Sequence, residues 1–131
     1  MAKARPKPGP RPDTGEPGLR AAQRLIDEWM RERGWAYWHP LSQLARMIEE
    51  LGELARLLNH LHGEKPKKTE EVAQDLGLEL ADLLYTIICL ANSQGIDLQD
   101  SLVRALAKYA ARDRDRYEVQ KEPPVIEPAG T

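Results

Sequence analysis

This chain of 131 residues contains no phenylalanine and only one cysteine. The single cysteine excludes a disulfide within the chain. Cys89 lies in an apolar run, where a lone cysteine typically acts as a small buried hydrophobe, and a lone thiol also fits a reducing compartment. We therefore expect Cys89 to belong to the core.

The chain also lacks an excess of charge of one sign and a long hydrophobic run. The net charge is −2 and the sequence pI is about 5.9, which argues against a general nucleic-acid coat. The N-terminus has no apolar core of a signal peptide, and the apolar run 83–91 is too short to span a membrane. These absences predict a cytoplasmic protein that binds neither nucleic acid nor membrane.

Proline and glycine are concentrated at the two ends of the chain. Residues 1–18 are rich in both and basic, and residues 118–131 have a similar proline-rich character. Such segments bury little apolar surface, so we expect a disordered arm and a disordered tail. The length suits one domain, which we expect at residues 19–117.

Apolar residues in this central segment follow a helical period, and no part alternates as a strand would. Prolines and glycines mark the expected helix ends, with Thr69 and Asp97 as expected N-caps. The expected helices run from Leu19 to about Arg33, from Pro40 to Gly63, from about Thr69 to Gly95, and from Asp97 to about Tyr117. The sequence therefore predicts an all-α, four-helix bundle-like domain.

Paired carboxylates occur on the second and third expected helices. Glu50 and Glu53 are three residues apart, as are Glu79 and Asp82. This spacing places each pair on one helix face, with β-carbons roughly 5–6 Å apart. Glu49 lies at the edge of the same acidic arc as Glu50.

The two pairs have different surroundings. Arg46 and Arg56 share the arc of the second helix, which by itself is typical of a solvated, salt-bridged face. The third helix is apolar in almost every direction, so we expect it to be buried all round, with its acids in or beside the core. No arginine or lysine lies within a turn of those acids on their own helix. An unpaired buried ion is costly, so another source of positive charge is needed.

A metal ion is the source that the pattern favours. Four carboxylates from two helices form an all-oxygen ligand set, which suits hard cations. Di-iron sites in helical bundles use Glu-x-x-His pairs, and neither pair here contains histidine. We therefore expect Mg²⁺, or alternatively Mn²⁺, rather than iron or zinc.

The acids also belong to a recognisable pattern. "EELGE" at residues 49–53 is followed, after a gap of 25 residues, by "ELAD" at 79–82. This resembles the EExxE and ExxD signature of the MazG-like nucleotide pyrophosphohydrolases, in the all-α NTP pyrophosphatase superfamily. The flanking segments "HPLSQLARMIEELGELARLLNHL" and "LANSQGIDLQDSLVRALAKYAARDRDRY" resemble its compact single-domain branch. The likeness covers roughly residues 29–117.

The resemblance implies a reaction and roles for the acids. A nucleoside or deoxynucleoside triphosphate is cut between its α- and β-phosphates, which releases the monophosphate and pyrophosphate, as in cleaning of the nucleotide pool. Glu50, Glu53, Glu79 and Asp82 would hold the metal. Glu49 would orient or deprotonate the attacking water.

Two groups of cations could contact the phosphates, and ordinary solvated charge is an equal alternative for both. One group is Lys65, Lys67 and Lys68 in the loop between the acidic helices. The resemblance favours the other group, on the fourth helix: Lys108, Arg112 and, less firmly, Arg116.

The aromatic stretch "WAYWHP" precedes the second helix. Such residues are typical of packing as well as of base stacking. The resemblance implies that Trp38 and His39 help to hold the base, and Asn92 is a further candidate for contact with the nucleotide.

An apolar helix in a chain of this size needs cover from another subunit, and the resemblance implies a homodimer or a dimer of dimers. Two other functions stay open. One is a phosphoribosyl-ATP pyrophosphohydrolase-like sister activity. The other is a non-catalytic helical oligomer that binds nucleotides or a protein, which would lack Mg²⁺-dependent release of pyrophosphate.

Overall fold

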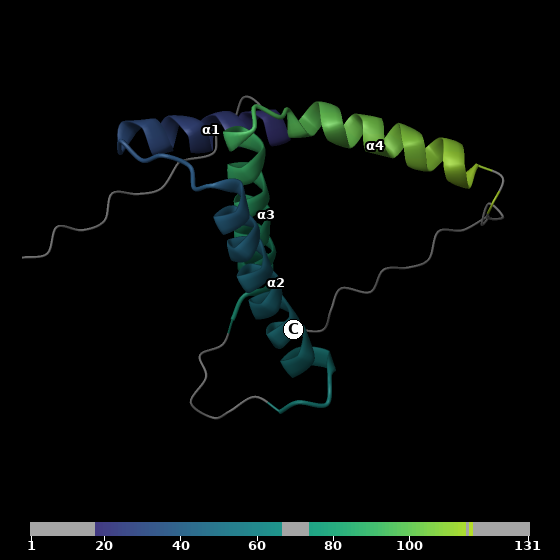
Figure 1. Cartoon of the computed structure of the whole chain (residues 1–131). Helices are drawn as coiled ribbons and strands as arrows, with labels where there is room; N and C mark the ends of the chain where they lie inside the picture. Colours follow the sequence, from purple (N-terminus) through teal and green to yellow (C-terminus); the bar gives the residue numbers. More distant parts are fainter. Residues whose placement is uncertain (1–17, 67–73, 115, 117–131) are drawn as a thin grey trace, which may run out of the picture. The chain divides into compact units, whose positions relative to one another are not determined.

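The computed structural model describes residues 18–66, 74–114 and 116, and these residues contain four helices and no strand. The helices are α1 (Leu19–Glu32), α2 (Pro40–His62), α3 (Leu76–Ser93) and α4 (Leu98–Asp113), as drawn in Figure 1. The predicted all-α class is confirmed. The expected disordered ends at 1–17 and 118–131 lie outside the described residues.

The chain divides into two compact units, residues 1–99 and residues 100–131. In the first unit, α2 and α3 run side by side in opposite directions, and α1 packs on α3 near its C-terminal end (Figure 1). This unit is therefore a helical hairpin with a third helix across one end. The second unit contains α4 from Asp100 onward and is described by itself.

Helices α1 and α3 both end where the sequence predicts, at a glycine in the left-handed region. Gly34 has φ 65° and Gly95 has φ 66°. The residue after each glycine donates its N–H back into the last turn, to the carbonyl of Met30 at 3.0 Å and to that of Ala91 at 2.9 Å. Glycine adopts this conformation without the steric cost of a β-carbon, so it ends both helices sharply.

The start of α3 differs from the prediction. Gln74 and Asp75 are not helical, and the Asp75 carboxylate caps the helix by accepting from the N–H groups of Gly77 at 2.7 Å and Leu78 at 3.2 Å. Thr69, the expected cap, lies outside the described residues. Aspartate is the stronger N-cap residue, and here it stands directly before the apolar period. The helix is therefore shorter at its N-terminus than its sequence suggests.

The core of the first unit lies between α1 and the C-terminal half of α3. It is formed by Ile26, Met30, Ile88 and Cys89, with Trp29 and other aromatic residues packed against it. Cys89 is 5% exposed, which confirms its expected place in the core, and burial raises the pKa of its thiol. The single thiol therefore acts as an apolar core group.

The expectation that the third helix is buried all round is wrong for the single chain. Leu80 is 50% exposed and Leu84 is 42% exposed, because α2 covers one side of α3 and α1 covers only its far end. By length and mean hydropathy, 1.3 over 18 residues, α3 could also cross a membrane. The core helix of a water-soluble protein passes the same test. Only 22% of that window is buried within the chain, and it contains two acids, Glu79 and Asp82.

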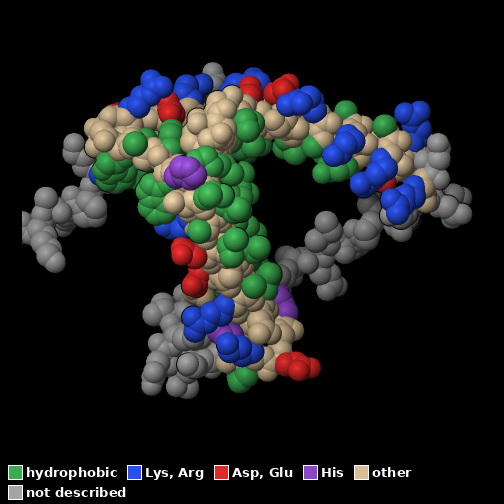
Figure 2. Space-filling view, viewed as in Figure 1, with side chains coloured by type: hydrophobic (Ala, Val, Ile, Leu, Met, Phe, Trp, Pro, Cys, Tyr) green, Lys and Arg blue, Asp and Glu red, His purple; other side chains and the backbone are tan. Residues whose placement is uncertain are grey.

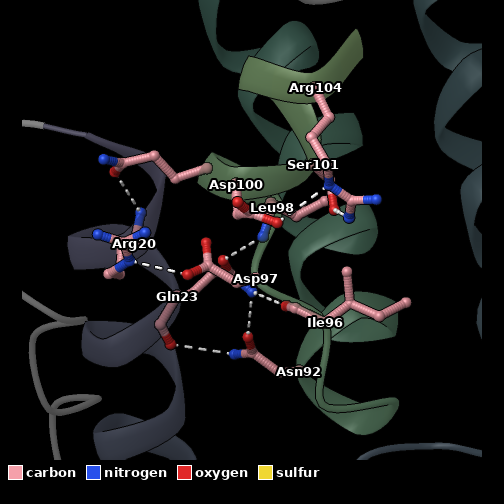
Figure 3. Close-up of polar contacts among 10 residues, drawn as sticks. Arg20, Gln23, Asn92, Ile96, Asp97, Leu98, Asp100, Ser101 and Arg104 are labelled. Carbon is pink, nitrogen blue, oxygen red and sulfur yellow. Dashed lines mark hydrogen bonds and ion pairs between the residues drawn. The ribbon is translucent and has the colours of Figure 1, made fainter.

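Gln23 joins the helices of the first unit at one point (Figure 3). Its side chain amide donates to Asn92 Oδ1 at 2.9 Å and to the carbonyl of Ile96 at 2.8 Å, and it accepts from the N–H of Leu98 at 2.9 Å. Asn92 returns a bond to the backbone carbonyl of Gln23 at 3.0 Å. Gln23 is 8% exposed, so these bonds replace water at the junction of α1, α3 and the start of α4.

Replacing Gln23 by leucine should lower the free energy of unfolding by roughly 2–4 kcal/mol, because the buried partners lose their hydrogen bonds while the volume is kept. Urea unfolding followed by circular dichroism measures the change. Gln94→Leu is the control, since Gln94 is exposed and bonds the neighbouring Ser93 side chain. Equal effects of the two substitutions would contradict a special role for Gln23.

Candidate functional site

Three carboxylates meet where α2 and α3 face each other. Oxygen atoms of Glu50, Glu79 and Asp82 all lie within 4.8 Å of one another. Glu50 follows the helical period of Leu54 and Leu57, which are buried on the same side of α2, and its side chain is only 12% exposed. Figure 2 shows acidic side chains grouped along the hairpin. Acids from the two predicted pairs therefore do meet when α2 packs on α3.

Arg46 of α2 supplies positive charge to this cluster. Its Nε donates to Glu50 Oε1 at 2.6 Å, one turn along α2. Partial burial raises the pKa of Glu79, and the negative charges of Asp82, Glu53 and Glu50 raise it further. The cluster is therefore compensated on one side, at Glu50, while its members still repel one another.

The other two predicted acids lie at the edge of this group. Among the described carboxylates, Glu53 does not join the three that converge, although its charge acts on the pKa of Glu79. Glu49 is exposed, and its charge helps to raise the pKa of Arg46. Both acids are thus close enough to act electrostatically, and their roles as ligand and as base stay predictions.

A cavity of about 530 Å³ lies beside the acids in the first unit. Its walls come from the end of α1, the segment 34–38, and the facing sides of α2 and α3. The lining residues are Met30, Gly34, Trp35, Ala36, Tyr37, Trp38, Gln43, Arg46, Tyr85, Thr86 and Cys89. The walls are largely aromatic and apolar, as in sites for flat organic ligands. Arg46 belongs both to the cavity wall and to the acid cluster.

The cavity wall is held by buried polar groups. The Tyr37 hydroxyl donates to Asp27 at 2.9 Å and accepts from Asn92 at 3.0 Å. Burial and the neighbouring Asp27 raise the pKa of Tyr37 to about 12. Gln43, which is 6% exposed, donates to the backbone carbonyl of Thr86 at 3.1 Å and so ties α2 to α3. These bonds hold Tyr37 and Gln43 in place in the wall of the cavity.

The three residues predicted to contact the nucleotide lie in different places. Trp38 lines the cavity. His39 caps α2, accepting from the N–H of Leu41 at 3.2 Å, and is not among the cavity-lining residues. Asn92 is engaged with Gln23 and Tyr37 at the helix junction. In the single chain, only Trp38 of these three is brought to the cavity.

The predicted phosphate-binding cations belong to the second unit. Arg112 forms two hydrogen bonds of 2.8 Å with Asp113, and both Arg112 and Lys108 lie over the ring of Tyr109. Arg116 lies 3.9 Å from the same aspartate. Since each unit is described by itself, contact of these cations with a ligand at the acids stays a prediction. Lys65 is exposed, and Lys67 and Lys68 lie outside the described residues.

Sequence reasoning missed most of the cavity. Tyr85, Thr86 and Gln43 gave no signal beyond helical spacing, because they reach the cavity only when α2 and α3 pair. Arg46 was considered as a partner of the glutamates but not as part of a ligand cavity. The aromatic stretch before α2 was the one signal in the sequence that pointed to this place.

The described residues thus form an all-α protein in which acids meet across a helical hairpin. The family profile described as MazG nucleotide pyrophosphohydrolase domain matches residues 39–117, more than half of the chain. This chain therefore belongs to the MazG nucleotide pyrophosphohydrolase family. The resemblance read from the sequence is confirmed.

Two proteins from Bacillus subtilis strain 168 are similar to this chain. The chain is 39% identical to the uncharacterized protein YpjD over 104 residues, which cover 79% of this chain and 94% of that protein. It is 31% identical to the uncharacterized protein YvdC over 88 residues, which cover 63% of this chain and 83% of that protein.

Two solved structures share the fold. The crystal structure of Bacillus subtilis YpjD has a TM-score of 0.68 at 38% identity and covers 76% of this chain and all of that chain. The crystal structure of the Bacillus-conserved MazG protein, described as a nucleotide pyrophosphohydrolase, has a TM-score of 0.64 at 34% identity. It covers 79% of this chain and all of that chain.

The raised pKa of Glu79 predicts how pH acts on the metal-free protein. The folded state holds this proton more tightly than the unfolded chain, so the contribution of Glu79 to stability falls as pH rises from its ordinary value of about 4.3 through the raised value. Glu79→Gln should therefore raise the melting temperature in EDTA at pH 7. Thermal melts from pH 4 to pH 8 measure this.

Addition of millimolar Mg²⁺ or Mn²⁺ should raise the melting temperature of the wild type, and Glu79→Gln should weaken that response. Glu28→Gln, an exposed acid paired with Arg24 on α1, is the control and should keep it. If the wild type melts at the same temperature in EDTA and in Mg²⁺, the acids do not hold a metal ion that stabilises the fold.

Proposed function

We propose that this protein hydrolyses a nucleoside or deoxynucleoside triphosphate to the monophosphate and pyrophosphate, with Mg²⁺ or Mn²⁺ as cofactor. The observation that carries the proposal is the convergence of Glu50, Glu79 and Asp82 from two helices. Family membership supports the same class of reaction, and the Bacillus-conserved MazG protein is described as a nucleotide pyrophosphohydrolase. A role in cleaning the nucleotide pool of the cytoplasm fits this activity.

The residues at the cluster fit a hard divalent cation. All the donors are carboxylate oxygens, three of them already close together and one of them, Glu50, largely shielded from solvent. Glu50, Glu79 and Asp82 would hold the ion, and Glu53 would complete the set. A bound cation would neutralise negative charge on the phosphates of the substrate.

The remaining steps fall to side chains around the cluster. Glu49, exposed beside Glu50 on α2, would accept a proton from the attacking water. The aromatic cavity would hold the base, with Trp38 in its wall. Cations of α4, Lys108 and Arg112 first, would contact the phosphates. Placing base and phosphates at fixed groups in this way would align the α-phosphorus with the water.

Hydrolysis in ¹⁸O-labelled water distinguishes this reaction from the alternatives. Attack at the α-phosphorus should place the label in the nucleoside monophosphate, with unlabelled pyrophosphate as the other product. Mass spectrometry of both products, over a panel of ribo-, deoxy- and damaged triphosphates, measures the outcome. Label in pyrophosphate, or a diphosphate as first product, would overturn the proposal. Preference for phosphoribosyl-ATP would favour the sister activity, and no turnover would favour a binding module.

The variant Glu49→Gln tests the proposed role of Glu49 as the base in the same assay. It should lose at least about a hundredfold in kcat, as expected for removal of a general base. It should still bind Mn²⁺ in calorimetry, because it leaves the converging acids intact. If Glu49→Gln loses Mn²⁺ as severely as Glu79→Gln does, Glu49 is a ligand and not the base.

We also propose that the protein works as a homodimer or a dimer of dimers. Five apolar residues of α2 recur at successive spacings of three, four, three and seven, and each is at least 39% exposed: Leu41, Leu44, Ile48, Leu51 and Leu58. Hydrophobic side chains are visible along the hairpin in Figure 2. A heptad stripe of this kind is the seam by which a helix packs on another helix, so a second copy of the hairpin suits it.

The substitution Ile48→Glu should break this contact. Size-exclusion chromatography with light scattering should show a dimer or larger species for the wild type and a smaller species for Ile48→Glu, because a charge is costly in a buried seam. Ser42→Glu, exposed and outside the stripe, should leave the mass unchanged. A wild type that is monomeric at all concentrations would refute the proposal.

A further inference from the structure

Within the described part of the chain, Arg46 alone belongs to both parts of the site. Its guanidinium bonds Glu50 in the acid cluster, and its side chain lines the aromatic cavity. The register of α2 explains this position. Arg46 lies one turn after Gln43, which lines the cavity, and one turn before Glu50. A single side chain therefore spans the boundary between the place proposed for the base and the place proposed for the metal.

The ion pair has unequal partners. The side chain of Glu50 is 12% exposed, whereas that of Arg46 is 43% exposed. Leaving Glu50 without a counter-charge is costly, since a shielded carboxylate needs a partner, but the guanidinium itself can reach solvent or a ligand without breaking the core. The field of Glu49 and Asp82 also favours a positive charge at this point. Arg46 is thus a counter-charge that another cation could replace.

We propose that Arg46 exchanges partners during binding. It neutralises Glu50 while no metal is present, and when a divalent cation occupies the acids it is released to contact a phosphate of the ligand in the cavity. This inference rests on the proposed function. Guanidinium groups bind carboxylate and phosphate oxygens with the same geometry, so one side chain serves both partners. Arg46 is in this sense a counter-charge of Glu50 in the absence of metal and a contact for the substrate in its presence.

The exchange predicts opposite effects on two ligands. Arg46→Gln should bind Mn²⁺ alone at least roughly threefold more tightly, because a charge that competes with and repels the ion is gone. With saturating Mg²⁺, the same variant should bind a triphosphate analogue with a methylene bridge between the α- and β-phosphorus about fivefold or more weakly. A purely structural role of Arg46 would weaken both.

Isothermal titration calorimetry measures both affinities, and neither requires turnover. Arg24→Gln is the matched control, since Arg24 forms an ion pair of the same i, i+4 type with Glu28 and its side chain is 42% exposed. It should change neither affinity. Arg46→Lys keeps the charge and should stay close to the wild type for Mn²⁺. Arg46→Met keeps the apolar stem and must reproduce both shifts of Arg46→Gln, so a folding defect of one neutral variant cannot decide the result.

Equal or weaker Mn²⁺ binding by both neutral variants would overturn the counter-charge role of Arg46. Unchanged affinity for the analogue would overturn its contact with phosphate. Failure of the proposed reaction has a different signature. If the wild type releases no pyrophosphate but the neutral Arg46 variants show both affinity shifts, the reaction alone is refuted. If the wild type turns over normally but the variants show neither shift, the exchange alone is refuted.

Discussion

Repulsion among carboxylates across the α2–α3 hairpin is the constraint on which the rest of the site depends. Two helices that pack through an apolar seam normally exclude like charges from it. Here Glu50 follows the period of the buried leucines and meets Glu79, which is partly exposed, and Asp82, which is exposed. The packing energy of the seam holds the acids together against their mutual repulsion. The hairpin thus keeps like charges close together, which is the basis of the proposed metal site.

The aromatic cavity depends on a second constraint, the position of α1 across the end of α3. The Gln23 amide and the Tyr37–Asn92–Asp27 bonds fix that position with buried polar groups, which are specific in geometry because each must be satisfied. The segment 34–38 then lines a cavity against α2 and α3. Acids and cavity are therefore placed by different interactions and meet at Arg46.

Exposed apolar surface remains on α2 and α3 of the single chain. The stripe on α2 and the exposed leucines of α3 explain why a helix as apolar as α3 is not buried within one chain. Sequence reasoning treated burial of that helix as a property of the chain, whereas much of its apolar surface is open for a partner. His39 and Asn92 show the same limit: both occur where a nucleotide-binding residue is expected, but cap formation and the helix junction engage them.

The sequence by itself determined the helices, because apolar period, glycine ends and caps act within a few residues. It missed the start of α3, where Asp75 directly precedes the apolar period, and it extended α4 beyond its end at Asp113. It also determined which acids pair, since a spacing of three fixes a shared helix face. Only the tertiary structure decided that Glu50 is shielded and bound to Arg46, that Glu53 stands apart, and that Tyr85 and Gln43 share a cavity with Trp38. These facts depend on how helices far apart in the chain pack, and local spacing carries no information about the partner across a seam.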